Sequence, residues 1–600
     1  MPLASRSSAL ALVAALGVAA GCTPPADEPA PDPETVAADL DGLFEQYFEE
    51  SMERNPLLGT FIGDPRYNAD LPNFLSPEYI AEQEAFDRRW LESIRAVDRE
   101  TLSGQDRLSY DIFVYERETA LEGARFPGEL VPLDQFSSFP SFFAQMGSGQ
   151  SVQPFKTEKD YRDFLVRIED AVVLFDQAIV NMREGMAKGV VQPRPLMEKV
   201  LPQLEAHVVD DPAESVFYVP VAEFPDEVPE EVREELCAAY VAAIESDIVP
   251  VYRRLLDFVR DEYLPACRET IAITALPDGE AWYAYLVKTQ TTSTMTPEEI
   301  HRFGLDEVAR ITGEMEQVMR EVEFDGTLQE FFTFLETDER FYFDDAEEVL
   351  EGYRALQATV NEKLPAAFDV FPQADYEVRA VPEFMQESAA GASYQPASPD
   401  GSRPGVFYVN TFNLKGQPRF GMETLSLHEA SPGHHFQISI AMEIEELPRF
   451  RRFGGQTAFF EGWALYAESL GKELGLFTDP YSYYGRLSDE MLRAMRLVVD
   501  TGMHAKGWSR EQAIAYMMEH SSMAETDVVA EVERYIAIPG QALAYKVGQR
   551  EISALRAEAE ERLGERFDLK AFHRAVLTDG ALPLQVLRRK MEEWVAAQEA

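Results

Sequence analysis

Apolar residues recur at intervals of three and four positions through most of the chain beyond about residue 35, as between Leu43 and Phe48. This spacing places them on one face of an α-helix, the face that packs into a core. Helix starts are also readable, because an N-cap residue precedes a first turn with proline, acid or amide at Ser76, Thr157, Thr296 and Ser509. The pattern predicts a mostly α protein built from many helices.

Two neighbouring stretches depart from the helical pattern. Residues 386–405 are rich in Ser, Ala, Gly and Pro without a period, which predicts a long loop. Residues 406–412 are β-branched and aromatic, which predicts a strand. A free edge of this strand could pair with an extended peptide substrate, and Asn410 is a candidate substrate-binding residue within it. A structural hairpin strand is the other interpretation.

Composition fits a large globular body. The chain has 600 residues, of which 46% are hydrophobic, so residues 41–600 can form one helical domain that could divide into lobes at 41–290 and 291–600. The net charge of −52 repels nucleic acid and anionic lipid headgroups, so neither is an expected partner. A solvated acidic coat is favoured over steering of cationic substrates, because the charges are dispersed along the chain.

The first 21 residues are typical of an export signal. An apolar run, Ala9–Ala20, is too short to span a bilayer as a mature helix. It ends in Ala19-Ala20-Gly21-Cys22, which resembles a bacterial lipobox. Cys22 would then carry a lipid anchor, and residues 22–40 would form a tether rich in proline and acid. The prediction is an exported cell-envelope lipoprotein; ordinary cleavage to a soluble secreted or periplasmic protein is the alternative.

Two further cysteines, Cys237 and Cys267, do not make a disulfide framework. They could pair in an oxidising envelope or remain as two buried thiols.

The segment from His428 to His435 holds three of the eight histidines of the chain, with Glu429 directly after the first. Neutral imidazoles and a carboxylate that activates water are the parts of a zinc hydrolase. On an unbroken helix His434 and His435 would lie roughly 9 and 10.5 Å from His428 along the axis, too far to share one ion.

A break in the helix would solve this distance problem. Pro432 removes a helical hydrogen bond and clashes with the preceding turn, and Gly433 permits unusual backbone angles. We expect the break to bring His434 to the metal beside His428. His435 should then point elsewhere, toward the substrate or a position behind the ligands.

Glu461 is the candidate third ligand. It lies in an apolar segment, residues 458–468, that reads as a buried helix, where a carboxylate is costly unless it is paired or bound to metal. Glu468 follows seven residues later on nearly the same face and could hold a ligand histidine from behind. A surface glutamate at a helix start is the other interpretation of Glu461.

Two later segments carry further candidates. On a helix over residues 492–506, Asp500 lies one turn before His504 and could orient it, or the pair could stabilise an exposed helix. His504 or Tyr545 could stabilise an oxyanion, as could Tyr535. Arg534 could hold a substrate carboxylate. By periodicity alone, the two tyrosines could equally be core residues.

These motifs together resemble a bacterial family, domain of unknown function 885. The matching segments are HExxPGHHxQ at 428–437, EGWALYAE at 461–468, DTGxHxxGW at 500–508 and PGQAxxYKxG at 539–548. The family is distantly similar to helical gluzincin peptidases such as thimet oligopeptidase and angiotensin-converting enzyme. The resemblance implies a helical peptidase body with two lobes around a channel, and it departs from those peptidases by the two-residue insertion at Pro432-Gly433.

The resulting hypothesis is a membrane-tethered zinc peptidase that cleaves short peptides as a carboxypeptidase or oligopeptidase, with one ion held by His428, His434 and Glu461. Glu429 would act as general base. Two alternatives stay open: a metal-dependent hydrolase of a non-peptide amide or ester, and a non-catalytic lipoprotein that binds peptide or metal. The sequence does not indicate the oligomeric state.

Overall fold

The computed structural model describes residues 33–382, 386, 390–397 and 404–599. The predicted signal peptide and the lipobox with Cys22 lie outside these residues. Helices dominate the described chain, with three short strands in one small sheet, which confirms the mostly α prediction. The first helix, α1 (Pro33–Arg54), begins inside the predicted tether.

The larger of the hydrophobic cores joins the two ends of the chain. Helices α1, α3 (Pro77–Arg95) and α4 (Gly104–Gly123) contribute to it together with α24 (Ala544–Leu563) and α26 (Leu584–Glu599). Phe44 of α1 packs against Phe450, with ring centroids 4.8 Å apart. Buried apolar area of this kind is what holds distant segments together, so the N-terminal helices belong to the same body as the C-terminal ones.

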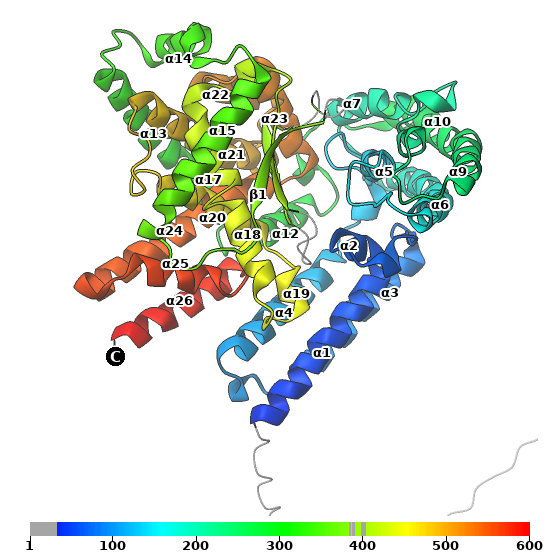
Figure 1. Ribbon diagram of the computed structural model, residues 1–600, viewed down its shortest axis with the longest axis horizontal. Coiled ribbons are helices and arrows are strands. Elements are labelled where there is room, and N and C mark those ends of the chain that lie inside the picture. Colours follow the sequence, from blue (N-terminus) through cyan, green and yellow to red (C-terminus); the bar gives the residue numbers. More distant parts are fainter. Residues whose placement is uncertain (1–32, 383–385, 387–389, 398–403, 600) are drawn as a thin grey trace, which may run out of the picture.

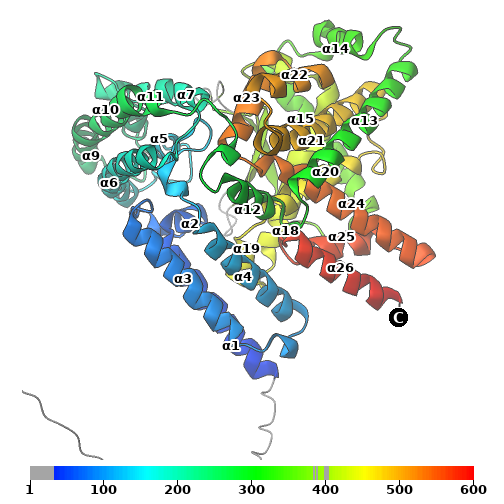
Figure 2. The same cartoon turned by 180° about the vertical axis from the view of Figure 1, so that it is seen from behind.

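A separate core defines a small lobe, residues 133–267. Apart from Leu71 and Leu75, the buried members of this core lie between Leu133 and Cys267. Its helices are α5 (Phe139–Gly147), α6 (Glu158–Lys188), α7 (Arg194–Glu205), α8 (Val219–Ala222), α9 (Glu230–Ala243), α10 (Val249–Phe258) and α11 (Leu264–Ala266). They gather on one side of the molecule (Figures 1 and 2). The hydrophobic cores therefore do not divide the chain near residue 290.

The remaining helices complete the main body. They are α2 (Pro56–Phe61), α12 (Gly279–Thr291), α13 (Pro297–Glu321), α14 (Leu328–Thr337), α15 (Ala346–Lys363), α17 (Met422–Glu429), α18 (His434–Glu443), α19 (Arg449–Arg452), α20 (Thr457–Ser469), α21 (Pro480–Lys506), α22 (Arg510–His520), α23 (Glu525–Ala537) and α25 (Leu569–Leu577).

The helix starts read from the sequence are confirmed. The Ser76 hydroxyl accepts a hydrogen bond from the Tyr79 amide at 3.1 Å. Thr157, Thr296 and Ser509 each begin a helix with a reciprocal capping box. Such caps satisfy amide groups that have no partner inside the helix, which is why local sequence sets these boundaries.

The sheet has the order β1-β3-β2, from β1 (Tyr376–Ala380), β2 (Ala392–Gln395) and β3 (Gly405–Val409). The predicted strand is the central one, paired in parallel with β1 and antiparallel with β2. Its edges are therefore occupied, and the proposal that it offers a free edge to a substrate is wrong. Strand β2 also falls inside the predicted long loop, because pairing with β3 compensates for its weak local pattern.

Two smaller points follow from the described residues. No helix among them has the length and apolar character that a membrane span needs. Cys237 and Cys267 are both free thiols, so they do not pair with each other.

Candidate metal centre

The helix break at Pro432-Gly433 is present. Helix α17 ends at Glu429, helix α18 begins at His434, and the Ser431–Pro432 peptide bond between them is cis. At Gly433 a Cβ atom would lie 1.9 Å from the His428 carbonyl oxygen, so only glycine fits there. The indole N–H of Trp463, on α20, donates to the Pro432 carbonyl at 2.7 Å. This hydrogen bond connects the segment between α17 and α18 to α20.

The break brings the three predicted ligands together. One side-chain atom of each of His428, His434 and Glu461 lies within 4.8 Å of the others. Glu461 Oε2 is 3.6 Å from His428 Nε2 and 3.3 Å from His434 Nε2. Two imidazole nitrogens and one carboxylate oxygen, converging from three helices, form a donor set that zinc accepts in peptidases.

The unpaired atoms of this cluster test whether a metal fits. Glu461 Oε2 is buried without a hydrogen-bond partner among the described residues, although a buried carboxylate oxygen normally has one. Burial would raise the pKa of Glu461, but His434 and His428 hold it well below its usual value. The Glu461 carboxylate thus stays ionised, and its Oε2 faces both imidazoles. This arrangement fits a bound cation.

Glu468 holds His428 from behind. The Nδ1 atom of His428 lies 2.7 Å from Glu468 Oε1, and donation from this nitrogen leaves Nε2 free to face Glu461. Arg493 lies on the other side of the same carboxylate, with Nη2 3.9 Å from Oε1, and pairs with Asp489 at 3.2 Å. Sequence reasoning missed this pair, although Asp489 and Arg493 lie one helical turn apart and Arg493 lies three residues before Arg496.

Glycines set how closely α20 and α24 cross. A Cβ at Gly548 would lie 1.9 Å from the Ala458 carbonyl oxygen, and a Cβ at Gly462 would lie 2.4 Å from the Gly548 carbonyl carbon. Glu461 directly precedes Gly462 on α20, and Tyr545 lies about one turn before Gly548 on α24. Close helix packing therefore places a candidate metal ligand and a candidate oxyanion donor beside each other.

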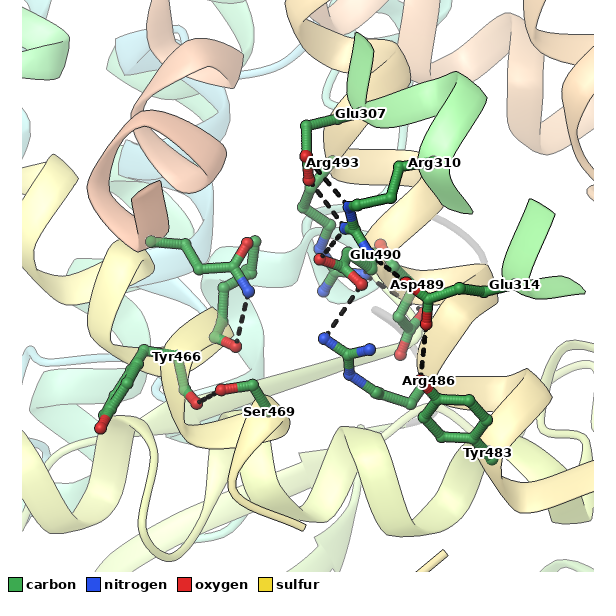
Figure 3. A network of polar contacts seen from close by, with 12 residues as sticks. Glu307, Arg310, Glu314, Tyr466, Ser469, Tyr483, Arg486, Asp489, Glu490 and Arg493 are labelled. Atoms are coloured by element: carbon green, nitrogen blue, oxygen red, sulfur yellow. Dashed lines mark hydrogen bonds and ion pairs between the residues drawn. The ribbon is translucent and has the colours of Figure 1, made fainter. Parts of the chain in front are cut away.

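A buried charge network fixes α24 next to Tyr545. Lys546 pairs with Glu490 of α21 at 2.5 Å and with Glu307 of α13 at 2.9 Å. Glu490 lies between Arg310 and Arg486, as Figure 3 shows. Burial would raise the pKa of Glu490, but the surrounding cations lower it to about 2, so the carboxylate stays charged. Satisfied networks of this kind rigidify the elements that they join.

Tyr545 lies between the metal site and a pair of arginines. Its hydroxyl is 3.3 Å from Arg534 Nη2, and the Arg496 guanidinium lies 4.6 Å from the centre of its ring. Burial raises the pKa of the Tyr545 hydroxyl, and the nearby Glu461 carboxylate raises it further. The Tyr545 hydroxyl therefore stays protonated, and its role as an oxyanion donor stays a prediction. Tyr535, the other tyrosine considered, is fully buried against Glu531 and Arg496.

Glu429 follows His428 directly at the end of α17 and is partly exposed. Among the residues that the structure describes, no hydrogen bond or ion pair engages its carboxylate. Its role as a general base stays a prediction.

The active-site role of His504 is wrong. His504 is fully buried, its Nδ1 accepts from the Ile273 amide at 3.1 Å, and its Nε2 donates to the Tyr535 carbonyl at 3.0 Å. Both ring nitrogens are used by backbone, so neither can face an oxyanion. Asp500 does not orient His504 either; its oxygens accept from the Tyr283 hydroxyl at 2.6 Å and the Gly540 amide at 2.9 Å. Asp500 instead anchors the turn that leads into α24.

His435 and Asn410 also have structural partners. His435 points away from the metal ligands, is 2% exposed, and its Nδ1 lies 2.9 Å from the Tyr394 hydroxyl. Burial lowers its pKa to about 4. It joins α18 to the sheet, so its substrate-binding role is wrong. Asn410 donates to the Gln386 carbonyl at 2.7 Å and accepts from the Phe412 amide at 3.1 Å, which ends β3 earlier than predicted.

Solved structures with a similar fold exist. A "putative lipoprotein" from Colwellia psychrerythraea is 31% identical, with a TM-score of 0.86, over 94% of this chain and 99% of its own. A "putative lipoprotein of unknown function" from Shewanella oneidensis is 19% identical, with a TM-score of 0.69, over 92% of this chain and 99% of its own. No relative was found among curated proteins.

The family comparison covers both the metal centre and the segments that support it. The family described as bacterial protein of unknown function (DUF885) matches residues 56–591. Because this match spans most of the chain and includes the helix break, the Glu461 segment and the Tyr545 segment, the chain belongs to the DUF885 family.

Proposed function

We propose that this protein is a zinc-dependent peptidase of the cell envelope. The observation that carries the proposal is the convergence of His428, His434 and Glu461 within 4.8 Å, with a partly exposed glutamate directly after the first ligand. Three protein ligands leave one position for water, which is the arrangement of catalytic rather than structural zinc. Side-chain exposures of 13% for His434 and 17% for Glu461 are compatible with access from solvent.

The residues around the site divide the work of amide hydrolysis. Zinc bound there would polarise the scissile carbonyl and make a water molecule more acidic. Glu429 takes a proton from that water as the water oxygen bonds to the carbonyl carbon, and it then passes the proton to the nitrogen of the leaving amine as the C–N bond breaks. The Tyr545 hydroxyl donates to the oxyanion that forms in between. Glu468 keeps His428 oriented throughout.

Two other functions stay in view. A metal-dependent hydrolase of a non-peptide amide or ester would use the same groups, and a panel of peptides and esters with and without chelator distinguishes it. A non-catalytic peptide-binding or metal-binding lipoprotein has no need of a base at position 429. The arginine beside Tyr545 favours a substrate with a carboxylate, and short peptides have one.

The envelope location is part of the proposal. The Colwellia protein, described as a "putative lipoprotein", supports it at 31% identity. Lipid attachment at Cys22 would hold the catalytic body at a membrane of the envelope, on its periplasmic or outer-surface side. Metabolic labelling with a fatty acid, compared with a Cys22→Ser variant, tests the anchor: loss of label in the variant is expected, and equal label in both contradicts it.

The central test is Glu429→Gln. This change removes the base and keeps the size of the side chain, so turnover of a short peptide should fall by about 10²- to 10⁴-fold. Zinc content, measured by elemental analysis, should stay at that of the parent. Glu445→Gln, which changes an exposed carboxylate in the turn after α18, is the matched control and should keep full activity. Unchanged turnover in the Glu429 variant would refute the assignment.

A further inference from the structure

Arg534 is a partly open cation beside the candidate oxyanion donor. Its side chain is 18% exposed, and its Nη2 contacts the Tyr545 hydroxyl at 3.3 Å and Gln541 Oε1 at 3.1 Å. Its Nε is buried without a hydrogen-bond partner among the described residues. A guanidinium that is held in place with unused donor capacity is suited to a planar anion.

The charge balance around Arg534 leaves room for that anion. Glu531 pairs with Arg534 at 3.5 Å and with Arg496 at 2.8 Å. Two guanidinium groups thus share one carboxylate, which leaves one positive charge in excess within this half-buried cluster. The chain as a whole has a net charge of −52, so a local cationic excess is contrary to the general trend of its surface. One carboxylate on a ligand would balance it.

An aromatic side chain of the small lobe lies against the same cation. The Phe136 ring centre is 4.9 Å from the Arg534 guanidinium carbon, and the residue is 51% exposed. Its position is fixed by its neighbour Gln135, whose amide donates to the Glu533 carbonyl at 3.2 Å. A large exposed aromatic held beside a partly open arginine offers an apolar contact next to an anion site.

We propose that Arg534 binds the free C-terminal carboxylate of the peptide substrate, with Phe136 contacting the terminal side chain, so that the enzyme removes one or two residues from the C-terminus. This inference rests on the proposed function, in which Tyr545 contacts the scissile carbonyl oxygen. The Tyr545 hydroxyl oxygen and Arg534 Nη2 are 3.3 Å apart. Two substrate oxygens that are hydrogen-bonded to these two atoms can therefore be separated by no more than about 9 Å. An extended chain advances roughly 3.3–3.6 Å per residue, so at most two residues fit between them.

The reaction balances without a further reagent. One water is added across the amide, its oxygen to the carbonyl carbon and one proton to the leaving nitrogen. The products are a shortened peptide with a new carboxylate and a free amino acid or dipeptide. The original C-terminal carboxylate stays bound to Arg534 through the step and leaves with the smaller product.

Binding can be measured separately from turnover in the Glu429→Gln protein. Its zinc-loaded form is titrated calorimetrically with one pentapeptide as free acid and as C-terminal amide. The free acid should bind about 10- to 100-fold more tightly, the range for hydrogen bonds to a charged group. Arg534→Met should abolish this preference, and Arg534→Lys should retain part of it. Arg550→Met, an exposed arginine on α24, is the matched control and should keep the full preference.

Product analysis with the unmodified enzyme gives the second readout. Mass spectrometry should show loss of one or two C-terminal residues from the free acid and at least about tenfold slower cleavage of the amide. Equal affinity for acid and amide, or a preference that survives in Arg534→Met, would overturn the inference, as would internal cleavage. If Arg534→Met does not fold, the acid-to-amide ratio in the parent and in Arg534→Lys decides. Absence of any hydrolysis would refute the proposed function instead, because the affinity ratio does not depend on turnover.

Discussion

Two kinds of histidine occur in this protein, and they differ in whether both ring nitrogens have a hydrogen-bond partner in the protein. His504 and His573 are both fully buried, and both nitrogens of each ring are used: His573 contacts the Ala367 carbonyl at 2.9 Å and the Tyr466 hydroxyl at 2.8 Å. In contrast, His428 and His434 each direct Nε2 at the same oxygen of Glu461, at 3.6 and 3.3 Å, and that oxygen has no hydrogen-bond partner among the described residues.

This difference separates a structural histidine from a candidate ligand. His428 is buried like His504, and an acidic side chain lies one turn from His504 just as one lies next to His428. What differs is whether other protein groups already form hydrogen bonds with both ring nitrogens. Here the imidazole nitrogens face a carboxylate oxygen that also has no hydrogen-bond partner among the described residues. Such an arrangement indicates that a bound ion belongs between them.

The largest effect is expected when a candidate metal ligand is removed. His428→Ala should remove the bound zinc and all measurable peptide hydrolysis, because two protein ligands hold the ion too weakly. His504→Gln should lower thermal stability and keep one zinc per chain. Elemental analysis of both purified proteins measures this, and His573→Gln replaces His504→Gln if the latter does not fold. Equal zinc content in the His428 and His504 variants would contradict the distinction.

A smaller effect is expected when the hydrogen bond between Glu468 and the ligand His428 is weakened. Glu468→Gln keeps the shape of the side chain but weakens the hydrogen bond to His428 Nδ1, so zinc affinity should fall by about 10- to 100-fold. Competition with a chromogenic chelator measures the affinity, with Glu445→Gln as the exposed control. An unchanged affinity would mean that the 2.7 Å contact does not support the metal site.

The effect of pH should reveal the structural histidines. Burial lowers the pKa of His504 and His573 to about 4, from 6.5 in an exposed imidazole. Both bind a proton more readily when unfolded, so the stability that they contribute is complete above pH 6.5 and is lost as pH falls through 4. At pH 5 the loss is about 2 kcal/mol for each histidine, before most carboxylates titrate.

Scanning calorimetry of the folded protein at pH 7.5 and pH 5.0 measures that loss. High salt should be present at both values, because it screens the repulsion within the acidic surface. The change in melting temperature from pH 7.5 to pH 5.0 should be less unfavourable in His573→Gln, which lacks one of these imidazoles, than in the parent, because Asp500 and the other titrating groups are the same in both proteins. An equal change in parent and variant would show that this imidazole is not held neutral by burial.

The features that were predicted correctly are those that short-range physics sets. Thr157, Thr296 and Ser509 cap helices through contacts three residues apart, so their neighbours in sequence suffice. The break at Pro432-Gly433 follows from the missing amide of proline and from the absent Cβ of glycine.

The features that were missed depend on partners far along the chain. His504 reads as a catalytic residue until Ile273 and Tyr535 are seen to occupy its ring. Strand β2 is predicted as loop because its stabilising partner, β3, is a separate segment. The pairing of Arg493 with Glu468 likewise crosses between two helices.

The sequence by itself determined the helical class, the helix starts and the break that makes the histidine spacing workable, because each depends on residues within one or two turns. Only the tertiary structure decided which titratable groups meet. It brought Glu461 to the two histidines by packing α20 against α17 and α18, placed Arg534 against Tyr545 and Phe136, and removed His504 from the site. The reason is that a side chain's chemistry depends on which of its polar atoms remain unpaired, and packing between distant segments decides that.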